Sequence, residues 1–448
     1  MSRTKTSAIV PILVGVFLLV LSPVVATDRP TTTLRQALNA AIENNIDLSI
    51  AQVQLQQTLR TQNTTASTYM PSFSLTGGIS TGGSLIGGIF SGLSANASAG
   101  ISMSFNGSMI TDSTTRSLAK ESANLSYQQT YGTLEDNITS SYWNLAANDN
   151  AVEEALLSLD QANRQMEIAQ QQYDNGLVPQ LTVVQARLSV SQAEIQLKQL
   201  QDSRNLALSA FRALTGITET DFTLEELPAT MELSLPDAQQ LYLEYAVSGT
   251  KVRSLQNSVA QATNDSKTTK LSSRVPTVSV SGSWGLSGSL VEGNSTVSQA
   301  TSGLSDTASV SVSVSVPLSS YISGTSQNLS IKNSEDAITT AQLQLQAGQQ
   351  TLLQSIESAV INITQQQESL RMKQQNMETT QYSYDLSLEA FEAGLLSSQE
   401  LETARTSLLN AQIDILSSQL SHLLSCYELA SLLEIDLTTL QTRYSASV

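Results

Sequence analysis

The chain contains the same segment twice, and this duplication constrains its fold more than any other feature. Tyr173 to Arg187 reads YDNGLVPQLTVVQAR, and Phe391 to Arg405 reads FEAGLLSSQELETAR. At one constant offset Gly176 corresponds to Gly394, and both copies end in Ala-Arg. An internal repeat of this kind predicts that the chain consists of two copies of one structural unit.

Each copy lies between two long stretches with helical periodicity. Ser113 to Asp174 contains one glycine and no proline, and as a single helix it would be ~93 Å long. After the turn at Asn175-Gly176, apolar residues recur at alternating spacings of three and four, which is typical of a coiled-coil seam. They are Val183, Ala186, Val190, Ala193, Leu197 and Leu200. These stretches predict antiparallel helical hairpins of unusual length.

The first residues predict export. Arg3 and Lys5 precede an apolar run from Ile9 to Leu21, and Val24-Val25-Ala26 follows with small residues. This run is shorter than the roughly 20 residues of a membrane-spanning helix, so residues 1–26 are interpreted as a signal peptide. The formal net charge of −17 makes the chain a poor ligand for nucleic acid.

The remaining chain divides into two units, 27–235 and 236–448, with the same order of elements. In the first unit we expect a helix over Thr33–Ser67, a β-hairpin over 71–108 and a long helical hairpin over 113–216. In the second we expect a helix from Pro236 to about Lys270, a β-hairpin over 276–318 and a long helical hairpin over 326–434.

Both β-hairpins alternate apolar and small polar residues, which predicts strands with two different faces. In the second hairpin Val310, Val312 and Val314 alternate with serines, whereas a glycine-rich loop is expected over 82–100 in the first. Such strands are long enough to cross a membrane, for which about 9 to 11 residues suffice. Closed barrels start at about eight strands, so a four-strand contribution predicts a barrel shared between chains.

Residues suited to catalysis or metal binding are scarce. His422 is the single histidine and Cys426 the single cysteine, which excludes His-rich metal sites and an intrachain disulfide. We interpret His422 as a polar layer in a helical seam and Cys426 as a small buried apolar residue. No cofactor, bound metal or enzymatic activity is expected.

The order of helix, β-hairpin, long helix, Gly-Leu reversal and heptad helix, repeated twice, resembles the TolC family of outer-membrane efflux proteins. The most specific motifs are the reversals, Tyr142-Trp143-Asn144-Leu145 with Val360-Ile361-Asn362-Ile363, and Leu214-Thr215-Gly216 with Leu432-Leu433-Glu434. The resemblance implies a mainly α fold with β structure, in which helical hairpins form a trimeric α-barrel. A 12-stranded transmembrane β-barrel, with four strands per chain, would cap it.

The resemblance also implies a function and a location. The homotrimer would sit in the lipid of the cell outer membrane with a long periplasmic extension, as a passive conduit for a tripartite efflux or type I secretion system. A periplasmic adaptor and an inner-membrane transporter would be its partners, and the adaptor would contact the reversal tips. Those tip residues are Tyr173, Asn175, Gly176, Leu177, Gly394 and Leu395. An exported coiled-coil spacer without a channel is the alternative.

A periplasmic gate is expected in the second reversal. The family has an acidic constriction residue six positions after the reversal glycine, which corresponds to Glu400, and an aromatic latch, which corresponds to Phe391. Glu402 lies beside Glu400, and one carboxylate per subunit would form a ring that favours cations. The first copy carries Thr182 in place of Glu400.

The second reversal differs from the family pattern at two positions of the expected gate, and Glu400 has a possible alternative role. Leu396 occupies a basic latch position, and Thr403 occupies the position of a second acid. Ser397-x-x-Glu400 also matches a capping box, so the alternative is that Glu400 only caps its helix.

Overall fold

The computed structural model describes residues 31–445 except 65–68, 82–92, 218–221, 229–230 and 291–303. The signal peptide expected over 1–26 and the tips of both β-hairpins therefore lie outside the described residues. None of the helices within the described ranges combines the length and hydropathy that a membrane span requires.

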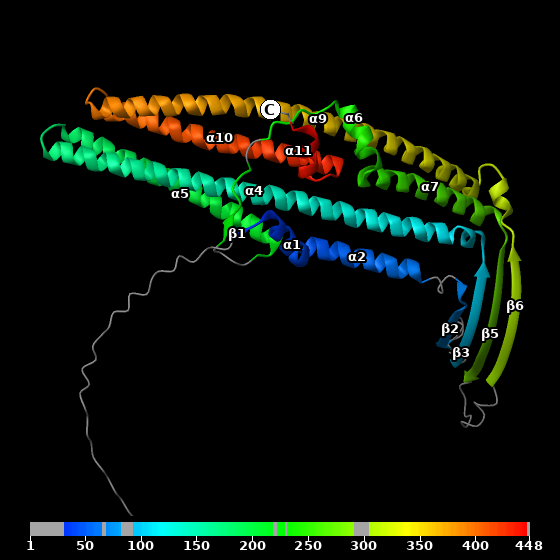
Figure 1. Ribbon diagram of the computed structural model, residues 1–448. Coiled ribbons are helices and arrows are strands. Elements are labelled where there is room, and N and C mark those ends of the chain that lie inside the picture. The colour runs from blue at the N-terminus through cyan, green and yellow to red at the C-terminus, as the bar shows by residue number, and fades with distance from the viewer. Residues whose placement is uncertain are drawn as a thin grey trace, which may run out of the picture.

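Two very long helices run along the molecule and give it the shape of a rod (Figure 1). Helix α4 (Asp112–Asp174) has 63 residues and α9 (Ser326–Glu392) has 67. At 1.5 Å per residue they are ~95 Å and ~100 Å long. Helices α5 (Gln180–Thr215) and α10 (Ser398–Leu433) return beside them, each with 36 residues. The predicted duplicated helical hairpins are confirmed.

The seam predicted for the first returning helix faces α4. Val183, Ala186, Ala193 and Leu197 are buried, whereas Val190 and Leu200 are half-buried. Apolar contacts at this spacing hold the two antiparallel helices together from Val183 to Leu197.

The helix expected over Thr33–Ser67 is wrong as a single element. Helix α1 (Leu34–Asn44) ends at Asn45, and α2 (Ile46–Asn63) starts after it. The Asn45 side chain accepts a hydrogen bond from the Leu48 amide at 3.0 Å and donates to the Leu214 carbonyl. Asparagine is a favoured N-cap, so it allows a break where neither glycine nor proline is present.

The helix expected from Pro236 to about Lys270 is also interrupted. Helix α6 (Ala238–Glu244) and the short 3-10 helix η2 (Ala246–Ser248) precede α7 (Thr250–Arg274). The break lies at Gly249, where the Glu434 carboxylate accepts a hydrogen bond from the Thr250 amide at 2.6 Å. A distant side chain thus satisfies the start of α7, which no local pattern in the sequence indicates.

Four antiparallel strands form a sheet at one end of the rod (Figure 1). They are β2 (Ser72–Thr81), β3 (Leu93–Phe105), β5 (Thr277–Leu290) and β6 (Leu304–Ser315), in the order β2-β3-β5-β6. The first hairpin loop was expected to reach Gly100, but residues 93–100 belong to β3. The alternating alanines of this segment are too weakly apolar to indicate a strand.

Helices α2 and α7 pack against the sheet-side halves of α4 and α9, while α5 and α10 pack against their other halves (Figure 1). Short segments wrap around the middle of the rod. They are the parallel pair β1 (Thr31–Thr32) and β4 (Thr223–Leu224), helix α6 and the C-terminal helix α11 (Leu437–Tyr444). The 3-10 helices η1 (Gly107–Ile110) and η4 (Leu318–Tyr321) connect the sheet to the long helices.

The main core lies beneath these wrapping segments. Tyr142, from the Tyr-Trp-Asn-Leu motif, is fully buried and packs against Trp143 and Phe211. Its hydroxyl donates to the Thr32 carbonyl at 2.8 Å and accepts from the Glu225 amide at 2.9 Å. One side chain of α4 therefore binds both the N-terminal segment and the connection between the two units.

Candidate functional site

Both long hairpins reverse direction at the end of the rod opposite the sheet (Figure 1). Gly176 and Gly394 have φ angles of +70° and +74°, a left-handed conformation that glycine adopts without steric cost. In each copy the amide of the next residue donates to the carbonyl five residues earlier, at 2.8 Å and 2.9 Å. This is the Schellman arrangement, and it explains why both copies have glycine at this position.

The reversal tips present apolar side chains to the surface. Leu177 is 73% exposed and Leu395 is 83% exposed. Tyr173 and Asn175 are exposed beside them. Protruding leucines at both tips form a candidate contact surface.

Glu400 lies at the start of α10, within a complete capping box. The Ser397 hydroxyl accepts a hydrogen bond from the Glu400 amide at 3.3 Å, and the Glu400 carboxylate accepts from the Ser397 amide at 3.0 Å. The Ser397 hydroxyl also donates to the Glu400 carboxylate at 2.7 Å, and this bond together with that from the Ser397 amide lowers the pKa of Glu400. The side chain is exposed and ionised, so the capping geometry does not remove its charge from the surface.

Glu402 occupies a different environment, although it is only two residues away. Its side chain is buried and forms a two-pronged ion pair with Arg405, with N–O distances of 2.6 Å and 3.0 Å. In this conformation the charge of Glu402 is therefore neutralised inside the protein, whereas that of Glu400 faces solvent.

Arg405 also reaches across to the other helical hairpin. Its Nη1 atom donates to the Ser158 carbonyl at 2.5 Å and to the Ser158 hydroxyl at 2.8 Å. Ser158 lies on α4, so this contact connects α10 of the second unit with α4 of the first. A cavity of about 90 Å³ adjoins the contact, lined in part by Glu154 and Tyr384.

Phe391 is half-buried and packs against a small apolar cluster near the second tip. The buried members of this cluster are Tyr384, Leu401 and Leu408. Phe391 thus connects the end of α9 to the first turns of α10, next to the Arg405 contact.

The first reversal lacks the equivalent polar contact. Arg187 corresponds to Arg405, but it is exposed and donates only to the Gln170 side chain, at 3.4 Å. Val184 stands where Glu402 stands in the second copy, and Thr182 stands where Glu400 does. The second copy therefore contacts the other hairpin through Arg405, whereas Arg187 of the first copy makes no corresponding contact.

Sequence reasoning identified Arg405 as a repeated residue but gave it no role. The available signal was Glu402-x-x-Arg405, a spacing that places two opposite charges on one helix face. Ser158 carries no such signal, because it is one of many serines and lies 247 residues from Arg405.

His422 and Cys426 are buried on successive turns of α10, with 3.8 Å between the His422 ring nitrogen and the Cys426 sulfur. Burial lowers the pKa of His422 and raises that of Cys426 to about 12. Cys426 belongs to the apolar core, as predicted, and His422 is buried in the helix seam. Among the described residues no three His, Cys, Asp or Glu side chains are grouped to bind a metal ion.

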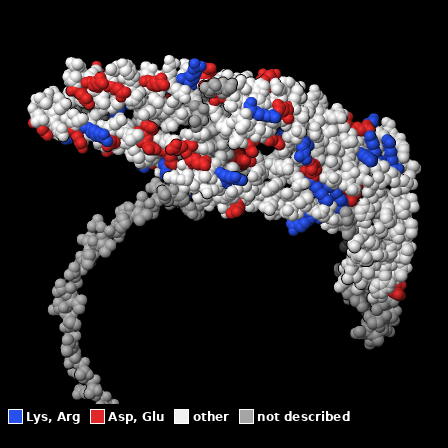
Figure 2. Space-filling model, viewed as in Figure 1, with Lys and Arg blue, Asp and Glu red and all other residues white. Residues whose placement is uncertain are grey.

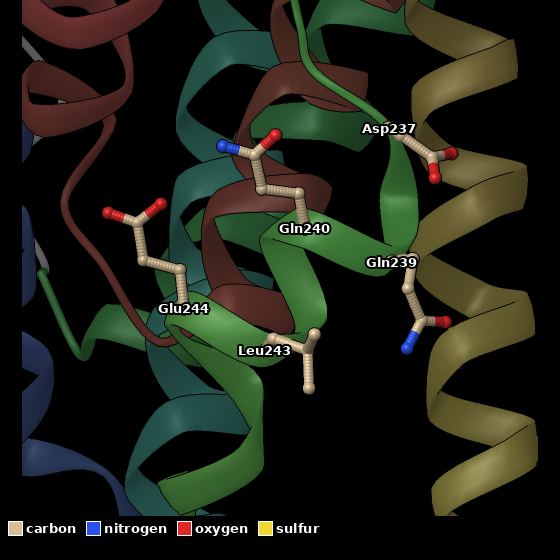
Figure 3. A pocket seen from close by; sticks show the side chains of 5 residues that line it. All are labelled: Asp237, Gln239, Gln240, Leu243 and Glu244. Atoms are coloured by element: carbon tan, nitrogen blue, oxygen red, sulfur yellow. The ribbon is translucent and has the colours of Figure 1, made fainter.

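A depression on α6 does not form a ligand site. It is lined by Asp237, Gln239, Gln240, Leu243 and Glu244. Figure 3 shows that Asp237 and Gln239 point one way while Glu244 points the other, so the polar groups do not converge on one position.

Comparison with known families gives one extended match. The family model described as outer membrane efflux protein matches residues 37–217 and 250–433, one segment in each unit. No curated protein matches the chain at a significant level.

Solved structures of outer-membrane channels share the fold. CusC has a TM-score of 0.71 and 15% identity, with 90% of this chain and 92% of CusC covered. The CmeC outer membrane channel of Campylobacter jejuni has a TM-score of 0.69 and 15% identity, covering 91% and 88%. The outer membrane protein VceC of Vibrio cholerae has a TM-score of 0.66 and 16% identity, covering 90% and 96%.

Proposed function

Since the chain belongs to the outer membrane efflux protein family, we propose that it is the outer-membrane channel of a tripartite efflux or type I secretion system. In this role it is a passive conduit that leads from the periplasm to the cell exterior. Passage through such a conduit changes no covalent bond of the solute, so transport needs neither a catalytic group nor a cofactor.

The sheet is the single observation that carries this proposal. Its strands have 10 to 14 residues, enough to cross a membrane when tilted. One face carries Phe73, Ile101 and Val312, which are exposed in the single chain, and the opposite face carries serine and threonine. Such a sheet suits a barrel wall between lipid and water.

The assembly required is a homotrimer. Among the described strands, β2 and β6 each have one unpaired edge, and in lipid every unpaired backbone group costs several kcal/mol. Three copies of a four-stranded sheet close into a 12-stranded barrel without edges. A neighbouring copy is therefore the partner that satisfies both edges.

A second apolar stripe on α5 supports the same assembly. Leu181, Val184, Leu188 and Ile195 are each more than half exposed, and they lie on the side away from the seam that packs on α4. Their spacing of three, four and seven residues is that of a coiled-coil seam without a partner. In the trimer an adjacent helical hairpin covers this stripe.

The reversal tips then form the periplasmic mouth. Six tips, two from each subunit, present the exposed leucines Leu177 and Leu395 to a periplasmic adaptor. Tyr173, Asn175, Gly176 and Gly394 shape the same contact surface, and an inner-membrane transporter completes the system.

The gate residues take separate roles in this proposal. Glu400 provides three exposed carboxylates that form a ring at the mouth and favour cations. Phe391 anchors the end of α9 against α10 beside this ring. Glu402 acts through Arg405, by holding its guanidinium in position to contact Ser158 and so to keep the two hairpins of a subunit together.

The oligomeric state of the membrane-extracted protein tests the proposal. A channel predicts a trimer in mild detergent that migrates as a compact species on an SDS gel when unheated and as a monomer after boiling. An exported coiled-coil spacer predicts a water-soluble protein whose migration does not depend on heating. Leu181→Asn and Leu188→Asn together should weaken the trimer, whereas substitution of exposed polar residues on α5 should not.

A further inference from the structure

The polar face of the sheet has an unusually uniform composition. At the strand positions whose side chains are described, this face carries only serine, threonine, glycine and asparagine. One cross-strand row shows the pattern, because Ser72, Ser102, Ser281 and Ser311 lie opposite one another across all four strands. No aromatic or charged side chain interrupts this face at the described positions.

The one charged residue in the described strands lies on the other face. Asp306 is paired in register with Leu286, near the end of the sheet away from the helices. Charged residues are also rare on the sheet as a whole. On the side visible in Figure 2, red and blue atoms are spread over the helical rod and nearly absent from the sheet.

Many hydroxyl groups on the polar face already have a partner on the next strand. The oxygen atoms of Thr76 and Ser98 are 2.6 Å apart, and those of Ser283 and Ser309 are 2.8 Å apart. The pair Ser281–Ser311 has a distance of 2.7 Å. A hydroxyl that is hydrogen-bonded across strands offers fewer free donors to a passing solute than an unpaired one.

We propose that the strand section of the conduit is a charge-neutral, weakly binding exit that does not select solutes by the sign of their charge. This inference rests on the proposed function, which makes the polar face the lining of the barrel. Fixed charges along a pore wall concentrate one sign of ion, and this wall carries none at the described positions. Cations, anions and uncharged solutes therefore pass this section with equal ease.

Thiol labelling with reagents of opposite charge measures the potential at the wall directly. The probe variant is Ser283→Cys, in the middle of β5, made in a Cys426→Ala background so that the engineered thiol is the only one. The full-length channel is reconstituted in lipid vesicles. It is treated with a methanethiosulfonate reagent that carries either a positive trimethylammonium-ethyl group or a negative sulfonatoethyl group. Each labelling rate is divided by the rate at which the same reagent labels a small free thiol.

Val280→Cys is the matched control, because it lies on the same strand with its side chain on the apolar face. We expect Ser283→Cys to react with both reagents at normalised rates that agree within about threefold, and Val280→Cys to react with neither. A preference of tenfold or more for one reagent at Ser283→Cys would show a charged wall and overturn the inference, since charged clefts raise local ion concentrations about 10-fold or more.

The remaining outcomes separate this inference from the proposed function. If neither variant reacts, the polar face does not line an aqueous pore, and both the inference and the channel itself are rejected. If Val280→Cys reacts and Ser283→Cys does not, the faces of the sheet are reversed and the exit is apolar. A charge preference at Ser283→Cys rejects the neutral exit alone and leaves the channel intact.

Discussion

The guanidinium of Arg405 contacts Glu402 on its own helix and Ser158 on the other hairpin. The side chains of Arg405 and Glu402 are 4% and 10% exposed, so the ion pair is shielded from water. This buried arginine therefore contributes a polar contact between the two halves of the duplicated chain, on the side of the rod that carries the reversal tips.

Removal of the guanidinium should loosen this part of the molecule. In Arg405→Ala the Glu402 carboxylate stays buried without its partner, a situation that typically costs about 3 to 5 kcal/mol. We expect the free energy of local opening around the start of α10, measured by amide hydrogen exchange, to fall by about 3 kcal/mol.

Arg187→Ala is the matched control, because Arg187 has the same position in the first copy but is exposed. Its effect should stay below about 0.5 kcal/mol, as for most surface substitutions. Equal losses in the two variants would contradict the role assigned to Arg405.

Ser158→Ala should give a smaller effect of the same kind. The substitution removes the hydroxyl acceptor but leaves the Ser158 carbonyl, which accepts the second hydrogen bond from Arg405. The expected loss is about 1 kcal/mol in the same exchange measurement. Ser203→Ala serves as the control, since the Ser203 hydroxyl bonds only to its own helix. A loss as large as that of Arg405→Ala would mean that the hydroxyl, and not the ion pair, joins the hairpins.

Cation preference should depend on the ionisation of Glu400. Because hydrogen bonds from Ser397 lower its pKa, the carboxylate stays charged at pH values where an ordinary Glu, with a pKa of 4.5, is half protonated. The cation-to-anion permeability ratio should fall as the pH drops through this lowered pKa. Ser397→Ala should shift this fall to higher pH.

Glu400→Gln separates charge from capping, because glutamine also completes a capping box. It should abolish the pH dependence of the permeability ratio while leaving the trimer intact. If Glu400→Gln changes neither the cation-to-anion permeability ratio nor its pH dependence, Glu400 only caps its helix.

The duplication made the long hairpins predictable, because periodicity and a repeated Gly-Leu turn are local signals. The breaks at Asn45 and Gly249 were missed because their stabilising partners, Leu214 and Glu434, are distant in sequence. The first residues of β3 were missed because alanine and serine alternate there with little difference in hydropathy. Periodicity shows which face of a helix is buried, but not which hairpin covers it.

The same limit applies to the candidate site. The capping alternative for Glu400 could be read from Ser397-x-x-Glu400, and the capping box is present. The spacing of Glu402 and Arg405 indicates their pairing, but burial of the pair could not be read, since the same spacing also occurs on exposed helix faces. Only the packing of α10 on α4 distinguishes the two.

Cys426 should be unreactive in the folded protein. It is fully buried in the core, and burial raises its pKa to about 12, so little thiolate exists at neutral pH. A maleimide should label it about 100-fold more slowly in the native protein than in denaturant. Rapid labelling of the native protein would show that α10 opens in solution.

Conductance across a planar lipid bilayer tests the channel most directly. The purified trimer should insert and produce discrete current steps that are stable at low voltage. Arg405→Ala should increase the fraction of time spent in larger steps, because each subunit loses the Arg405–Ser158 contact between its two hairpins. A correctly folded trimer that inserts into the bilayer, but carries no current either as wild type or as Arg405→Ala, would contradict the account.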